Sequence, residues 1–104
     1  MQSPKAPELI VSRITEGSLA KPPATKSFKA GCVVLSPGQT VSSHFTGDGD
    51  EALIVLEGTA TVFLGQNPSE VPAGSAAFIP PRTEHSVANR TTGNVKYVYV
   101  AAFK

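Results

Sequence analysis

The chain contains two histidines, His44 and His85, and a glutamate, Glu51, that follows the first histidine closely. Alternation along residues 40–46 places His44 on one face of a strand-like run, and Glu51 begins the next run. A hairpin through residues 47–50 would bring these two side chains together. Imidazole and carboxylate groups bind divalent metals and also carry out general acid–base catalysis. Spacing alone does not bring His85 to the other two residues.

The elements that must position these residues are short. Glycines and prolines recur too often for a sustained helical periodicity, and the runs between them are rich in β-branched residues. Such runs, separated by turn residues, predict an all-β sandwich or barrel. The expected strands cover residues 9–14, 28–35, 40–45, 51–56, 59–64, 75–79, 85–88 and 95–102.

Residues 38–58 resemble the first conserved motif of the cupin family, Gly-x5-His-x-His-x3–4-Glu-x6-Gly. Gly38, His44, Glu51 and Gly58 occupy motif positions, and Thr46 stands where the family has its second histidine. His44 is one of only two histidines in the chain, and the other, His85, lies in the second motif.

Residues 74–89 resemble the second cupin motif, Gly-x5-Pro-x-Gly-x2-His-x3-Asn. Gly74, Pro80, His85 and Asn89 occupy its positions, and Arg82 replaces the second glycine. The two motifs together span half of the chain.

The resemblance implies a double-stranded β-helix, which is a jelly-roll-like barrel of two antiparallel sheets. His44, Glu51 and His85 would point inward near one mouth of this barrel. Residues 8–104 would form the single barrel domain, and residues 1–7 a flexible tail. Small cupins commonly form homodimers, so the resemblance also implies a homodimer, with the run at 9–14 as the candidate exchanged or interface edge.

Typical metal-binding cupins use three histidines and one glutamate, and the substitution at Thr46 leaves three of these four ligands. One interpretation is a two-histidine, one-carboxylate site for Fe, Mn, Zn or Ni, with open coordination positions and a water held by Thr46. Another is a barrel that has lost its metal. The simplest interpretation is that His44 and His85 are interior histidines that hydrogen-bond Glu51 or water. We favour the metal site, because two imidazoles and a carboxylate in a small apolar barrel cost free energy unless they are paired.

The resemblance leaves the reaction open, since cupin relatives include dioxygenases, isomerases, cyclases, decarboxylases and lyases. The expected function is binding of a divalent metal and a small polar organic molecule, with a metal-dependent enzyme as one form of it. Glu51 would then be a ligand or nearby base, and Arg82 would bind a substrate carboxylate or be a solvated loop residue. The alternatives are a non-catalytic ligand-binding or sensing module and a metal-free assembly unit.

Three further side chains have expected roles. Cys32 is expected to be a small buried hydrophobe. Tyr97 and Tyr99 share one face of their strand and would line a pocket or form an interface.

Composition excludes several other functions. The 104 residues carry a net charge of +1 and no cluster of Lys and Arg, which argues against a nucleic-acid surface. No apolar run approaches the length of a membrane span. A single cysteine excludes an intrachain disulfide, and the start of the sequence has no apolar core of a signal peptide. These features predict a cytoplasmic protein.

Overall fold

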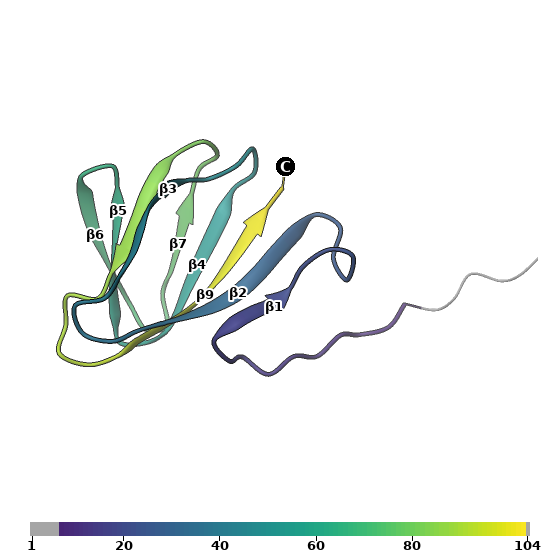
Figure 1. The fold of residues 1–104 in the computed structure, drawn as a ribbon, viewed down its shortest axis with the longest axis horizontal. Helices are drawn as coiled ribbons and strands as arrows, with labels where there is room; N and C mark the ends of the chain where they lie inside the picture. The colour runs from purple at the N-terminus through teal and green to yellow at the C-terminus, as the bar shows by residue number, and fades with distance from the viewer. Residues whose placement is uncertain (1–6, 104) are drawn as a thin grey trace, which may run out of the picture.

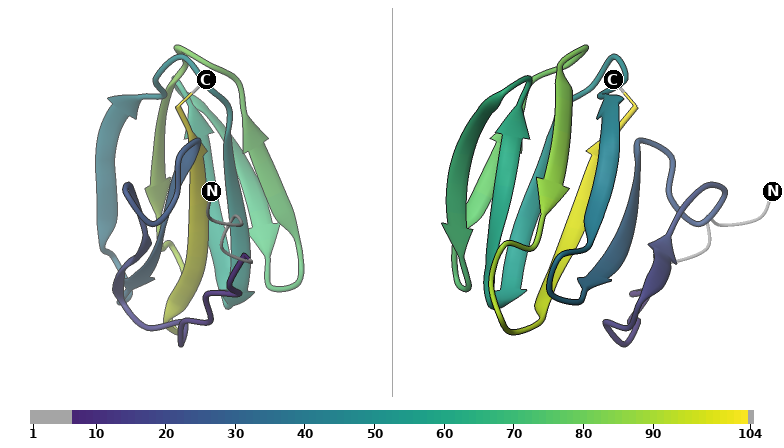
Figure 2. Two further views of the ribbon diagram at one scale, coloured as in Figure 1. Left: turned by 90° about the vertical axis from the view of Figure 1, so that its right-hand side faces the viewer. Right: turned by 60° about the vertical axis from the view of Figure 1, so that its left-hand side comes forward.

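The computed structural model describes residues 7–103, which form two antiparallel sheets that face each other (Figures 1 and 2). The first sheet has the order β1-β2-β9-β4-β7, and the second has the order β3-β8-β5-β6. The strands are β1 Gly17–Ala20, β2 Phe28–Leu35, β3 Thr40–Phe45, β4 Glu51–Glu57, β5 Thr59–Leu64, β6 Asn67–Pro72, β7 Ala76–Ile79, β8 Glu84–Ala88 and β9 Val95–Ala102.

The core lies between the two sheets. Its buried cluster takes Leu53 and Val55 from β4 of one sheet and Val62 and Val87 from β5 and β8 of the other. Alternate residues of β4, β5 and β9 therefore face this core, as a sandwich with two inner faces requires. The all-β double-stranded β-helix predicted from the sequence is confirmed. In the part of the chain that the structure describes, no helix is long and apolar enough to span a membrane.

One predicted strand is wrong. Residues 9–14 form no strand, and the first strand begins at Gly17. The apolar side chains of this segment are exposed, with Leu9 90% and Val11 82% accessible, and the segment runs away from the barrel (Figure 1). A strand needs a ladder neighbour, and this segment has none in the single chain. Its role at an interface and the homodimer itself stay predictions, and residues 1–6 of the predicted tail lie outside the described residues.

Two motif residues outside the ligand set hold the barrel together. Asn89 is 1% exposed, and its amide donates to the carbonyl oxygens of Leu35 at 2.9 Å and Gly93 at 2.7 Å. It thereby ties the loop before β9 to the end of β2. Gly58 has a φ of 72°, and a Cβ there would collide with the carbonyl oxygen of Asn94. Both positions thus serve structure, because a buried amide satisfies backbone groups and only glycine fits the close approach.

Candidate metal centre

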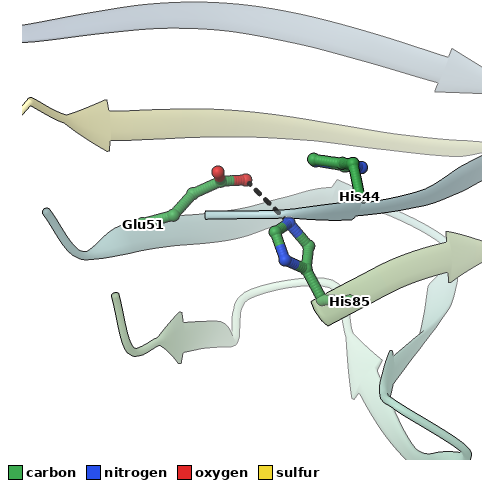
Figure 3. A group of neighbouring side chains, drawn as sticks. All are labelled: His44, Glu51 and His85. Atoms are coloured by element: carbon green, nitrogen blue, oxygen red, sulfur yellow. Dashed lines mark ion pairs between the residues drawn. The ribbon is translucent and has the colours of Figure 1, made fainter. Parts of the chain in front are cut away.

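The structure brings the three predicted ligands together. His44 on β3 and His85 on β8 are cross-strand partners, and their ring centroids lie 4.2 Å apart. Glu51 begins β4 in the opposite sheet, and its Oε2 lies 3.7 Å from Nε2 of His85. One ligand atom from each residue lies within 4.8 Å of the others, and Figure 3 shows the three side chains converging. The barrel therefore supplies the convergence that sequence spacing could not.

Backbone carbonyls orient both imidazoles. Nδ1 of His44 lies 2.9 Å from the carbonyl oxygen of Ser42, and Nδ1 of His85 lies 3.0 Å from that of Thr83. A carbonyl oxygen only accepts hydrogen bonds, so each Nδ1 carries the hydrogen and each neutral ring keeps its lone pair on Nε2. Metal-binding histidines are commonly held in this way by a partner on the other ring nitrogen.

The Nε2 atom of His85 has no hydrogen-bond partner among the described residues, although the side chain is only 1% exposed. The Glu51 carboxylate oxygen, 3.7 Å away, is also an acceptor. Two acceptors that face each other in a buried site leave a polar atom unsatisfied, which costs about 1–3 kcal/mol. A divalent cation between them would satisfy both, so the residues present fit a metal ion.

Thr46 has a structural role where the cupin motif has its second histidine. Its hydroxyl donates to the carbonyl oxygen of Pro80 at 2.6 Å and accepts from the backbone N–H of Thr83 at 2.8 Å. The side chain thus connects the end of β3 to the turn before His85. Its hydrogen is already committed to Pro80, and the water that Thr46 was predicted to hold stays a prediction.

Arg82 lies in that same turn, outside the residues that line the cavity of the site. Its guanidinium Nη1 lies 3.4 Å from Oδ1 of Asp48, and both side chains are about three-quarters exposed, at 72% and 73%. The structure therefore pairs Arg82 with a loop carboxylate across the two turns at the mouth. Its predicted contact with a substrate carboxylate stays a prediction.

Replacing Arg82 with glycine is expected to raise the free energy of unfolding by about 0.5–1 kcal/mol. Arg82 has a φ of 51°, and this left-handed conformation costs a residue with a Cβ about 1–2 kcal/mol. The gain is reduced by the greater backbone entropy of glycine in the unfolded chain and by loss of the exposed ion pair, which contributes little. Urea unfolding measures the change, and Arg82→Ala is the control because it keeps the Cβ. Equal stabilities of the two variants would refute the strain.

A cavity of about 380 Å³ opens beside the candidate ligands. Its wall is mainly apolar, with aromatic side chains and a few polar groups, the composition expected of a small-molecule site. It is lined by Lys29, Val33, Val41, His44, Phe45, Thr46, Gly47, Asp48, Glu51, Tyr97, Tyr99, Ala101, Ala102 and Phe103.

The structure places three of the residues singled out in the sequence and adds one. Tyr97 and Tyr99 line it, as the pocket interpretation expected, and Cys32 is buried at 2% exposure as a small core residue. Lys29 was not predicted as a site residue. Its parity with Val33 and Leu35 along β2 was the available signal, because Leu35 belongs to the core and residues of the same parity face the same side.

Burial raises the pKa of the Tyr97 phenol well above its usual value, and the negative charge of Glu51 raises it further. The folded protein therefore holds this proton more tightly than the unfolded chain, whose tyrosines ionise near pH 10. The resulting stabilisation is complete below about pH 10 and is lost as the pH rises above that value.

Tyr97→Phe is consequently expected to lose less stability than the wild type between about pH 9 and 11.5. The difference should approach about 1.4 kcal/mol per pH unit in the upper part of this range, which is the limit for one proton. Urea unfolding of the metal-stripped proteins at a series of pH values measures it. Parallel stability curves for the two proteins would show that Tyr97 does not contribute.

Comparisons with known proteins identify the family and the fold. A family model described as "Cupin domain" matches residues 31–101, well over half of the chain. Mannose-1-phosphate guanylyltransferase RfbM of Salmonella typhimurium is 33% identical over 64 residues, which cover 62% of this chain. The chain spans only 13% of the length of that relative.

Solved structures share the fold. The cupin domain of Cnp3 from Schizosaccharomyces pombe superposes with a TM-score of 0.76 at 20% identity, covering 85% of this chain and 63% of that one. An RmlC-like cupin family protein with a double-stranded β-helix fold from Methanocaldococcus jannaschii has a TM-score of 0.73 at 20% identity, covering 91% of this chain and 86% of that one. At these identities the likeness concerns the fold alone.

Proposed function

We propose that this chain, which belongs to the cupin family, binds a divalent metal ion through His44, Glu51 and His85 and holds a small polar organic molecule beside it. The observation that carries the proposal is the buried, unpartnered Nε2 of His85 facing the Glu51 carboxylate. Such an arrangement is costly for an empty protein site and favourable for a ligand set.

The three residues divide the work of the site. His85 is buried and Glu51 is half-buried, so they form the inner part of the ligand set, whereas His44 is exposed toward the mouth. With three protein ligands, coordination positions remain for an oxygen atom of a bound molecule. A bound divalent ion would supply Lewis acidity to that oxygen. The carbonyls of Ser42 and Thr83 hold the two rings in the tautomer that such binding needs.

Elemental analysis tests the proposal. Metal-stripped protein is incubated separately with Fe(II) under anaerobic conditions, Mn(II), Zn(II) and Ni(II), then desalted. We expect roughly one ion per chain with at least one of these metals, and negligible metal in the His44→Ala, His85→Ala double variant. Glu84→Gln is a matched control, because this exposed carboxylate precedes His85 and hydrogen-bonds Ser43 rather than the ligand set. Negligible binding of all four metals by the wild type would refute the proposal.

A further inference from the structure

We infer that the metal-loaded cavity takes a small organic dicarboxylate with an apolar body, and that Lys29 binds the carboxylate that lies away from the metal. This inference rests on the metal site proposed above and assigns a ligand class and a specificity residue to it. It is carried by the position of Lys29 in the sheet, by its charge, and by the wall between it and Glu51.

The sheet register places Lys29 in line with the metal site. Ala101 of β9 pairs with Lys29 of β2 on one side and with Glu51 of β4 on the other. All three line the cavity, and neighbouring strands lie about 4.8 Å apart, so the backbones at Lys29 and Glu51 are about 10 Å apart. The residue between them is an alanine, so a molecule can lie across it and reach both the metal and the ammonium group.

The neighbouring cross-strand pair of this sheet also leaves space for a ligand. Gly31 pairs with Tyr99, and a Cβ on Gly31 would collide with the ring and the hydroxyl of Tyr99. The Tyr99 ring therefore lies down against the backbone of β2 instead of standing up into the cavity. Val33 and Val41 add apolar side chains to the cavity lining. The part of the ligand between its two charged ends is consequently expected to be apolar.

The charges of the cavity are unbalanced. No carboxylate among residues 7–103 lies within ion-pair distance of Lys29, and Asp48, the other acidic residue of the lining, pairs with Arg82. A divalent ion held by one carboxylate and two neutral imidazoles keeps a single positive charge, and Lys29 adds a second. A dianion neutralises both, with one carboxylate at the metal and one at the ammonium group, where charge-assisted hydrogen bonds are strong.

Three probes test this arrangement on the zinc-loaded protein, since zinc has no redox chemistry. They are 3-phenylglutarate, its monoamide, which lacks one charge, and glutarate, which lacks the phenyl group. Calorimetric titration should give a dissociation constant for 3-phenylglutarate about 2- to 5-fold lower than that of the monoamide, because Lys29 is exposed and solvent screens its charge. Glutarate should bind more weakly than 3-phenylglutarate, because it leaves the apolar wall uncovered.

Variants of Lys29 test whether this residue causes the preference for the dicarboxylate over the monoamide. Lys29→Met keeps the apolar stem and should abolish the preference for the dicarboxylate over the monoamide, whereas Lys29→Arg should keep it. Lys26→Met is the control, because it removes an equal charge from an exposed residue outside the cavity lining. A wild type with bound zinc and no preference, or a preference that survives in Lys29→Met, would overturn the inference.

The zinc content of every sample is measured alongside the titrations. All Lys29 and Lys26 variants are expected to keep roughly one zinc ion per chain, because neither residue belongs to the ligand set. A wild type that holds neither zinc nor any of the other three metals refutes the metal site, and with it the dicarboxylate. If one of the other three metals binds and zinc does not, the titrations use that metal. A zinc-loaded wild type without charge preference refutes the role of Lys29 alone.

Discussion

Replacing His85 with phenylalanine is expected to stabilise the metal-free protein by about 1–2 kcal/mol and to abolish its metal binding. The imidazole places a polar Nε2 atom in a buried site where no described residue satisfies it. A planar phenyl ring removes that unsatisfied atom and its desolvation cost. The carbonyl oxygen of Thr83, which loses the Nδ1 donor, still accepts from the backbone N–H of Thr46 at 3.1 Å. Urea unfolding in the presence of a chelator measures the gain.

His44→Phe is the matched control. It removes the cross-strand partner of His85 and should also abolish metal binding, but His44 is exposed, so the stability of the metal-free protein should change by no more than about 0.5 kcal/mol. The wild type alone should gain stability from zinc, by about 2.7 kcal/mol at a free concentration 100-fold above its dissociation constant. A metal-free His85→Phe protein that is less stable than the wild type would contradict the expected gain.

The stability gain expected for His85→Phe could not be predicted from the sequence, although the metal ligands could. The spacing of His44, Glu51 and His85 matched two cupin motifs, and the structure brings the three together as that resemblance implied. Which nitrogen of each ring bears the hydrogen depends on the carbonyls of Ser42 and Thr83, and these are contacts of the folded backbone. Spacing identifies ligands, whereas their tautomers and burial are tertiary properties.

The same distinction explains the errors in the strands. Residues 67–72 were not predicted as a strand because Pro68 and Pro72 count as breakers, yet β6 is the edge of its sheet, where proline is tolerated. Residues 9–14 were predicted as a strand because they are apolar and β-branched, yet they have no ladder neighbour. Lys29 was overlooked because its importance comes from Ala101 and Glu51 on the adjacent strands. In all three cases, the role of the segment or residue depends on which strand it pairs with, and that pairing is a property of the folded chain.

Thr46→Val is expected to lower the free energy of unfolding by about 2–4 kcal/mol. The substitution keeps the shape of the side chain but removes both hydrogen bonds of the hydroxyl, at 2.6 Å to Pro80 and 2.8 Å from Thr83, in a residue that is only 7% exposed. Each buried partner left unsatisfied costs about 1–3 kcal/mol. Thermal or urea unfolding measures the loss. Thr46→Ser keeps the hydroxyl and should cost only about 1 kcal/mol for the missing methyl group.

Thr46→Val should also weaken zinc binding by about 10-fold, although Thr46 is not a ligand. Thr83, which this hydroxyl fixes, supplies the carbonyl that orients the His85 ring, and loss of such supporting contacts commonly costs 10- to 100-fold in metal affinity. Thr46→Ser should bind zinc as the wild type does. A Thr46→Val protein with unchanged zinc affinity would show that the turn holds His85 without this hydroxyl.

Thr46→His, which restores the residue of the cupin motif, should therefore fail to tighten zinc binding. The added imidazole replaces the hydroxyl that joins β3 to the turn at residues 80–83, so the turn and the His85 ring that it carries lose their support. We expect a protein destabilised about as much as Thr46→Val. A variant that keeps wild-type stability and binds zinc more tightly would contradict this, because it would mean that the barrel can accept a fourth ligand without the hydroxyl. The substitution at Thr46 is thus coupled to the turn around it, and one mutation does not reverse it.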